Sequence, residues 1–310
     1  MGRGEGNNLS AKGVPFPASL THKMIPSSSP IIILGGRGML GTDLAAVLTA
    51  AGRSVRVLDL PECDVRNPAH LDAAVAEGGV IVNCAAYTNV DKAESEPELA
   101  QQVNALAPAE LGRLAKIRDA YVLHISTDFV FDGSLDRPYT ETDIPRPLSV
   151  YGATKLAGEQ LLDASGCRHA TVRVQWTYGA AGNHFLNKLA ERARAGGVVR
   201  VVADQFGAPT WTRDVSTALL AVLDRQTTGL YHFAAAGYAS RFEVAQQLAA
   251  ALKLPARLEP CQTSDFPAPA QRPLNSRFNC AKIDALLPAT PRRPWPAAMA
   301  DYIAQYMVTK

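Results

Sequence analysis

Three glycines spaced three residues apart offer the first chemistry in this sequence. Gly35, Gly38 and Gly41 follow the apolar, β-branched run at residues 31–34, and the residues after them have helical character. Glycines in such a turn let the backbone approach a pyrophosphate, and the N-terminus of the following helix offers amide donors and a favourable dipole to the phosphates. The spacing predicts nucleotide binding, with a structural glycine turn as the alternative.

Two charged residues near this loop point to different dinucleotides. Asp59 ends the next predicted strand, and a carboxylate there accepts hydrogen bonds from an adenosine ribose, which favours NAD. Arg37 lies inside the loop and is able to pair with a 2′-phosphate instead. The choice between NADH and NADPH stays open. Asp64, next to Val65, is either a partner for the adenine edge or a turn residue before a capped helix.

Tyr151 and Lys155 lie four residues apart, on one face of a predicted helix. Free tyrosine titrates near about 10, and a nearby ammonium favours the phenolate, so the pair suits proton exchange with a hydroxyl or a carbonyl. The same spacing occurs at Tyr306 and Lys310, where we assign it no meaning. Tyr151 differs in position, because it comes after a predicted strand that ends at residues 126–128.

Alternating strands and helices must position these residues. Apolar runs predict strands over residues 31–34, 54–59, 80–84, 121–126 and 169–174. Helical patterns fall between them, over residues 40–51, 67–75, 99–116 and 150–164. This alternation indicates βαβ units and a parallel sheet with helices on both faces, and the continuously apolar strands agree with burial on both sides.

The second half of the chain is less regular. Helices are predicted over residues 185–195, 214–224, 241–252 and 296–307, with short strands over 199–202 and 230–233. Proline is dense over residues 255–296, which predicts loops and turns. We therefore expect an α/β, Rossmann-like doubly wound parallel sheet with a smaller, interleaved C-terminal substrate-binding lobe.

The expected domain organisation has three parts. Residues 1–29 form a disordered tail, residues 30–174 a dinucleotide-binding Rossmann domain, and residues 175–310 mainly the substrate-binding lobe. A segment near 199–224 is expected to return to the first domain.

Composition excludes several classes of protein. The 310 residues are 47% hydrophobic and carry a formal net charge of +2, which gives no case for a broad nucleic-acid-binding surface. No run approaches the ~18 apolar residues of a membrane helix. The five cysteines are scattered, which indicates reduced thiols in a cytoplasm, and the six histidines form no metal-binding pattern.

Five signatures resemble the dTDP-4-dehydrorhamnose reductase family of extended short-chain dehydrogenases/reductases. They are NCAAYTNVDKAE at 83–94, STDFVFDG at 126–133, YGATKLAGE at 151–159, DQFGAPT at 204–210 and RPLNS at 272–276. The resemblance runs from about residue 30 to near the C-terminus. Met39, Phe129 and Gln175 depart from the residues common in the family, and Gln175 leaves the exact substrate pocket open.

The resemblance implies roles for the matching residues. Thr127, Tyr151 and Lys155 would be the catalytic trio: Tyr151 protonates the developing alkoxide, Thr127 bonds the same oxygen, and Lys155 holds the nicotinamide ribose and tunes Tyr151. The expected cofactor site comprises Gly35, Gly38, Met39, Leu40, Gly41, Asp59, Asp64, Val65, Ala85, Ala86 and Tyr87, together with Tyr151 and Lys155.

Three further residues are expected to bind the substrate. Asp128 would accept sugar hydroxyls, Trp176 would pack on sugar or base, and Arg272 would clamp the pyrophosphate. The alternatives are a core aromatic for Trp176 and a surface ion pair for Arg272. Asn104 and the residues around 173–176 are expected near the same cleft.

The implied activity is the reduction by NADPH or NADH of the C4 ketone of dTDP-4-dehydrorhamnose to dTDP-L-rhamnose, for cell-surface polysaccharide. The alternatives are reduction of another 4-keto-6-deoxy sugar nucleotide and a non-catalytic, dinucleotide-binding regulatory subunit. Retention of the trio disfavours the second. Magnesium has been associated with the family, but no motif here places it. The expectation is a cytoplasmic protein with a small-molecule dTDP-sugar partner and no nucleic-acid or membrane partner. A homodimer is the candidate assembly.

Overall fold

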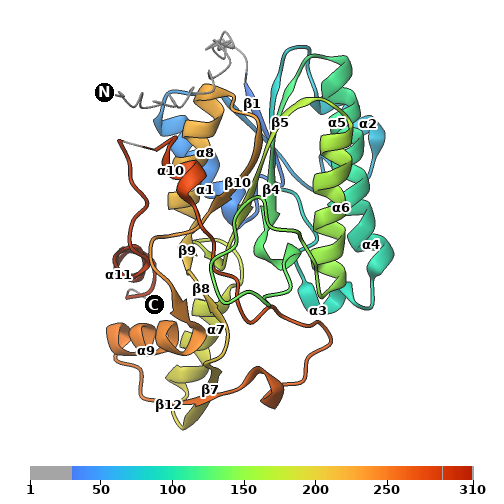
Figure 1. Ribbon diagram of the computed structural model, residues 1–310. Coiled ribbons are helices and arrows are strands. Elements are labelled where there is room, and N and C mark those ends of the chain that lie inside the picture. Colours follow the sequence, from blue (N-terminus) through green and yellow to red (C-terminus); the bar gives the residue numbers. More distant parts are fainter. Residues whose placement is uncertain (1–29, 288, 309–310) are drawn as a thin grey trace, which may run out of the picture.

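A six-stranded parallel sheet forms the centre of the molecule (Figure 1). The computed structural model describes residues 30–287 and 289–308, so the tail predicted at 1–29 lies outside the described residues. The strands are ordered β10-β5-β4-β3-β1-β2, and every neighbouring pair is parallel. Their bounds are β1 (Ile31–Leu34), β2 (Val55–Leu58), β3 (Val80–Asn83), β4 (Tyr121–Thr127), β5 (Arg168–Val174) and β10 (Gly229–Phe233).

Helices cover both faces of this sheet. On one face α1 (Met39–Ala50) lies beside α8 (Thr212–Arg225), and on the other lie α2 (Pro68–Ala74), α5 (Ala107–Ile117) and α6 (Val150–Ala164) (Figure 1). Alternate residues of β1 point to opposite faces of the sheet. Ile31 and Ile33 belong to the core with α1 and α8, and Ile32 and Leu34 to the core with α2 and α5. This two-sided burial explains the continuously apolar strand and confirms the predicted doubly wound fold.

The helix predicted over residues 99–116 is interrupted by one wider turn. It consists of α4 (Pro97–Gln101), a π-helical segment η1 (Gln102–Leu106) and α5. A π-helical turn adds a residue to the helix and often marks a functional site. Here it contains the buried Asn104, whose amide bonds the backbone of Tyr87 and the hydroxyl of Thr154.

A second lobe, below the sheet in Figure 1, has its own apolar core. The helices are α7 (Phe185–Arg194), α9 (Arg241–Leu252) and α11 (Trp295–Tyr306), and the paired strands are β7 (Val198–Val202) and β12 (Arg257–Cys261). Short elements complete the chain: α3 (Val90–Ala93), α10 (Ala281–Asp284), β6 (Thr177–Tyr178), β8 (Phe206–Gly207), β9 (Thr210–Trp211), β11 (Ala239–Ser240), and the 3-10 turns η2 (Asp128–Val130) and η3 (Thr263–Asp265).

The prediction of loops and turns over residues 255–296 missed β12. Pro260 lies within that strand, and proline is tolerated there because β12 has a single partner in a two-stranded sheet. Of the segment near 199–224, α8 packs on α1 while β7 pairs with β12. The chain thus passes between the lobes more than once. Among the described residues no helix is long and apolar enough to cross a membrane.

A buried ion pair joins α6 to β5. Arg173 Nε and Nη2 donate to the two carboxylate oxygens of Glu159 at 2.9 and 2.6 Å, and the side chains are 2% and 9% exposed. The Arg173 guanidinium also lies over the Phe131 ring, 5.0 Å from its centroid. Removing one partner of such a pair leaves an uncompensated charge in the interior, and this strongly destabilises the fold.

We expect Glu159→Gln to lower the free energy of unfolding by about 3–5 kcal/mol, because Arg173 stays buried and charged without its counter-ion. Urea unfolding measures the change. The control is Glu110→Gln, which removes the exposed pair with Arg113 on α5 and should cost less than about 1 kcal/mol. Equal decreases in the free energy of unfolding in the two variants would contradict a stabilising role for the Glu159–Arg173 pair.

Candidate active site

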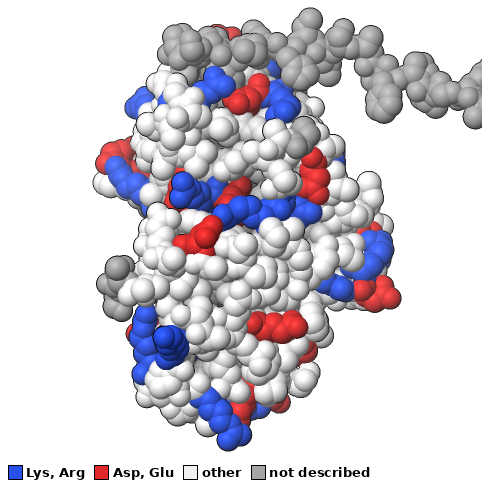
Figure 2. Space-filling model, turned by 90° about the vertical axis from the view of Figure 1, so that its left-hand side faces the viewer, with Lys and Arg blue, Asp and Glu red and all other residues white. Residues whose placement is uncertain are grey.

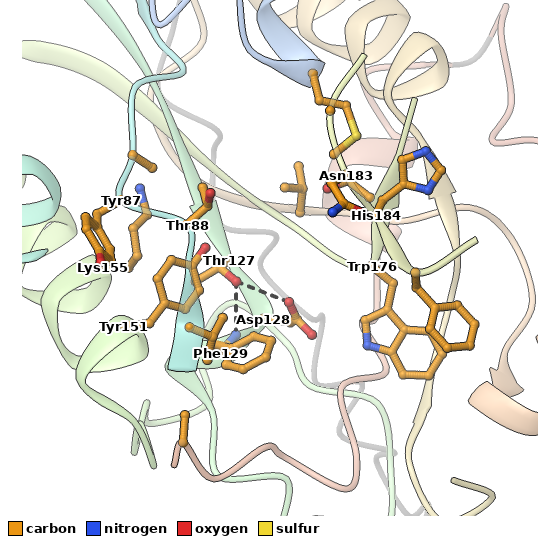
Figure 3. Close-up of a pocket in the computed structure, with 18 of the residues that line it drawn as sticks. Tyr87, Thr88, Thr127, Asp128, Phe129, Tyr151, Lys155, Trp176, Asn183 and His184 are labelled. Carbon is orange, nitrogen blue, oxygen red and sulfur yellow. Dashed lines mark hydrogen bonds between the residues drawn. The ribbon is translucent and has the colours of Figure 1, made fainter. Parts of the chain in front are cut away.

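A cavity of about 1480 Å³ opens between the two lobes, at the carboxyl ends of the parallel strands. One wall consists of the glycine loop and the segments that follow β2, β3 and β4, and the other of segments from the second lobe. In open α/β sheets, ligands bind at this edge. Figure 3 shows the part of the cavity where side chains from both walls face one another.

The glycine loop is packed too tightly for side chains. A Cβ on Gly35, which has a φ of +68°, would lie 2.6 Å from the Ala85 backbone nitrogen, and a Cβ on Gly41 would lie 2.5 Å from the Gly36 Cα. Helix α1 begins after Gly38 with no side-chain cap and no acidic residue in its first turn. Its first amides are therefore available to an anion.

The structure places all the expected cofactor residues on the lining of this cavity. They are Gly35, Gly38, Met39, Leu40, Gly41, Asp59, Asp64, Val65, Ala85, Ala86, Tyr87, Tyr151 and Lys155.

The two residues that bear on the choice of dinucleotide are both engaged. Asp59 accepts hydrogen bonds from the backbone nitrogens of Arg37 and Leu60, each at 2.8 Å. The Arg37 guanidinium forms a two-bond pair with Glu62, at 2.6 and 2.8 Å. Asp64 pairs in the same way with Arg66. Glu62 and the Leu60 carbonyl, which Arg37 also contacts, would therefore compete with a 2′-phosphate for this guanidinium.

Thr127, Tyr151 and Lys155 converge where β4 ends and α6 begins (Figure 3). The Thr127 hydroxyl bonds the Asp128 carboxylate at 3.2 Å and accepts the Phe129 amide at 3.2 Å. Lys155 Nζ donates to the Ile125 carbonyl at 2.7 Å. Tyr151 lies at the first turn of α6 and Lys155 one turn later, so the helix presents both to the cavity.

Local contacts fix α6 in that position. Ser149 caps the helix by accepting the Gly152 amide at 3.2 Å. A Cβ on Gly152 would lie 2.2 Å from the Phe129 carbonyl oxygen, and one on Gly158 would lie 2.0 Å from that of Asn104. The two glycines thus let α6 lie directly against the segment after β4 and against the π-helical turn.

Burial sets the protonation of the trio. It raises the pKa of Tyr151 to about 12, against the opposing effect of the Thr127 hydroxyl. It lowers the pKa of Lys155 to about 8, although the nearby Glu159 favours the ammonium. At neutral pH the site therefore holds a neutral phenol beside a charged amine.

The expected substrate residues lie in different environments. Asp128 is 3% exposed and extends toward the side of the cavity where Trp176 lies (Figure 3). Burial raises the pKa of Asp128, and the nearby Ser276 and Arg241 oppose that shift. Trp176 has a left-handed backbone, with a φ of +41°.

Arg272 lines the cavity as expected, and its guanidinium is engaged by the protein itself. It donates to both oxygens of Asp91, at 2.9 and 2.6 Å, and to the Ala270 carbonyl. The Gln175 side chain, where the sequence departs from the family, is fully buried and accepts the Ala208 amide at 2.7 Å.

Arg241 was not predicted to be a site residue. It lines the cavity, and its guanidinium lies 3.6 Å from the centroid of the Trp176 ring. Its only local signal is the Ser240–Glu243 capping box at the start of α9. That pattern predicts a helix N-terminus and gives no sign of the distant tryptophan.

Cations outnumber anions on the cavity lining. Seven lining residues are Lys or Arg and three are Asp, in a chain whose net charge is +2. On the face of the molecule in Figure 2, basic and acidic side chains are interspersed. The described residues contain no group of three or more His, Cys, Asp or Glu suited to a metal ion. The geometry fits anionic organic ligands.

Comparisons with known proteins agree with this geometry. The family model described as RmlD substrate binding domain matches residues 29–308. A dTDP-4-dehydrorhamnose reductase of Mycolicibacterium smegmatis is 41% identical over 88% of this chain and 85% of its own. A probable dTDP-4,6-dihydroxy-2-methyloxan-3-one 4-ketoreductase of Streptomyces antibioticus is 38% identical over 79% of this chain and 85% of its own.

Solved structures give the same result. The dTDP-4-dehydrorhamnose reductase ortholog of Clostridium acetobutylicum superposes with a TM-score of 0.84 at 32% identity, covering 89% of this chain and 99% of the other. The Bacillus anthracis reductase in complex with NADP gives 0.82 at 29% identity, covering 91% and 99%. The chain belongs to the dTDP-4-dehydrorhamnose reductase family.

Proposed function

We propose that this protein reduces the C4 ketone of dTDP-4-dehydrorhamnose to give dTDP-L-rhamnose, with NADH or NADPH as the reductant. The observation that carries the proposal is the convergence of Thr127, Tyr151 and Lys155 on one cavity, in a chain of this family. Purified protein should oxidise NAD(P)H when dTDP-4-dehydrorhamnose is added, and should form dTDP-L-rhamnose. Absence of turnover with either nucleotide would refute it.

The glycine loop suits a nicotinamide dinucleotide. The uncapped first amides of α1 and the absence of side chains at Gly35 and Gly41 would hold its pyrophosphate. Asp59 would accept from the adenosine ribose. When bound, NAD(P)H supplies the hydride that reduces the ketone carbon.

The protein's own residues supply the proton that the ketone oxygen receives. Tyr151 is a neutral phenol at the operating pH, so it can donate to the ketone oxygen as negative charge develops there. The Thr127 hydroxyl would turn its proton from Asp128 to the same oxygen, which stabilises the charge before the proton of Tyr151 has transferred. Lys155, anchored at the Ile125 carbonyl, places a positive charge beside the phenolate that remains.

A second candidate substrate is a different 4-keto-6-deoxy sugar nucleotide. The similarity to the Streptomyces antibioticus ketoreductase supports this second candidate, because the name of that relative gives a different dTDP-sugar as its substrate. The catalytic trio would act in the same way, and only the residues in contact with the sugar would differ. Comparison of kcat/KM across a set of dTDP-4-keto sugars separates the two candidates.

We expect Tyr151→Phe to lower kcat by about 10²- to 10⁴-fold, because it removes the proton donor and little else. The affinity for NADPH, measured by fluorescence titration, should be retained. Tyr238→Phe is the matched control: this tyrosine is exposed, bonds the Phe278 carbonyl and does not line the cavity. Near-normal turnover by Tyr151→Phe would remove Tyr151 from the mechanism.

We also expect kcat/KM for reduction to fall as the pH rises through about 8. Burial holds the pKa of Lys155 near that value, so the ammonium is present below it and lost above it. Tyr151 stays protonated across this interval, since its pKa is about 12. In Lys155→Arg the charge persists, so the fall should move to higher pH although the rate is lower. An unshifted profile in that variant would assign the titration to another group.

A further inference from the structure

Asp128 and Arg241 are opposite charges that face one cavity without touching each other. Asp128 Oδ1 accepts the Thr127 hydroxyl, and the Ser276 hydroxyl lies close to the carboxylate. The buried Oδ2 accepts no hydrogen bond of normal geometry from a described residue. The Arg241 guanidinium donates no hydrogen bond to any described residue and forms no ion pair with Asp128, although the two charges interact electrostatically. Both residues line the cavity, and both retain unused hydrogen-bonding capacity.

The position of Arg241 is fixed by its surroundings. It is the first residue of α9, which the Ser240–Glu243 capping box holds, and its backbone nitrogen donates to the Gln205 carbonyl at 3.1 Å. The guanidinium lies over the Trp176 ring at 3.6 Å and near the Phe185 ring at 5.0 Å. Stacking fixes the plane of a guanidinium and leaves its N–H groups free.

Gly207 also lies against the Trp176 ring. A Cβ on Gly207 would lie 2.6 Å from the ring, so the strand β8 backbone lies against the indole. Trp176 is thus in contact with both Gly207 and Arg241. This packing makes Trp176 a positioning residue for the guanidinium.

Two other arginines of the same wall, Arg200 and Arg272, are already paired. Arg200 bonds Asp265 at 2.6 Å, and Arg272 bonds Asp91 through both carboxylate oxygens. Arg241 differs from these two because aromatic rings, rather than a carboxylate, hold it. An arginine held in this way keeps its donors for a ligand.

We propose that Arg241 and Asp128 together bind a hydroxyl group of the substrate's sugar, with the hydroxyl donating to Asp128 and accepting from Arg241. This proposal rests on the proposed function. A hydroxyl is both donor and acceptor, so one such group satisfies both charges at once. A phosphate has no such fit, because its charge would be repelled by Asp128 while Arg241 attracted it. Arg241 is therefore a residue that sets specificity for the sugar, beside the catalytic trio.

The test compares binding of dTDP-L-rhamnose and of dTDP by calorimetry, in wild type and in Arg241→Gln. We expect the variant to bind dTDP-L-rhamnose about 10- to 100-fold more weakly, as for loss of a hydrogen bond to a charged group, and to bind dTDP normally. Arg213→Gln is the matched control, since Arg213 also lies over an indole, that of Trp211, but is exposed and outside the cavity.

A double-mutant cycle separates a shared hydroxyl from two independent contacts. If one hydroxyl bridges both groups, the double variant Asp128→Asn with Arg241→Gln should bind dTDP-L-rhamnose little more weakly than whichever single variant binds it less well. Equal weakening of dTDP and dTDP-L-rhamnose in Arg241→Gln would assign Arg241 to the diphosphate and overturn the proposal, as would unchanged binding of both. Failure of the proposed function is distinguishable, because wild type would then neither reduce dTDP-4-dehydrorhamnose nor prefer dTDP-L-rhamnose to dTDP.

Discussion

The close approach of α6 to its neighbours is the constraint on which the active site depends. The helix has no side chain where it meets the Phe129 and Asn104 carbonyls, so its backbone lies directly against them. A larger residue at Gly152 or Gly158 would push the helix outward. Tyr151 and Lys155 would then move away from Thr127, which belongs to a different element. Catalytic geometry tolerates such displacement poorly.

The electrostatics of the cavity follow from burial. Its depth keeps Tyr151 protonated, weakens the hold of Lys155 on its proton, and leaves Asp128 with an unpaired oxygen. The excess of cations on the lining suits a dinucleotide and a sugar nucleotide, both of which carry pyrophosphates. A protein of near-neutral charge achieves this by placing a few cations in one concave region.

Much of this arrangement follows from local sequence. The glycine loop, the βαβ alternation and the α6 helix each depend on neighbouring residues, and the structure has them where the patterns indicate. The π-helical turn around Asn104 was not predicted, because no residue type in 102–106 marks a wider turn and the segment still has helical character. Strand β12 was missed because its proline is acceptable only once the strand is known to have one partner.

Tertiary contacts account for the rest. Arg272 meets Asp91 across 181 positions of sequence, so its pairing has no local signature. Arg241 depends on the distant Trp176, which in turn needs the glycine at position 207. A cation whose partner is an aromatic ring leaves no charge pattern to read.

The passage of the chain between lobes affects how the protein can be assembled. Helix α8 covers Leu44 and Leu48 of α1, and β10 covers the edge of β5, yet both are made after the first strands of the second lobe. On the ribosome, the first five strands would emerge with an uncovered apolar face and an unpaired sheet edge. Such surfaces favour association between nascent chains. The six-stranded sheet therefore cannot be finished before α7 and β7 of the second lobe have been synthesised.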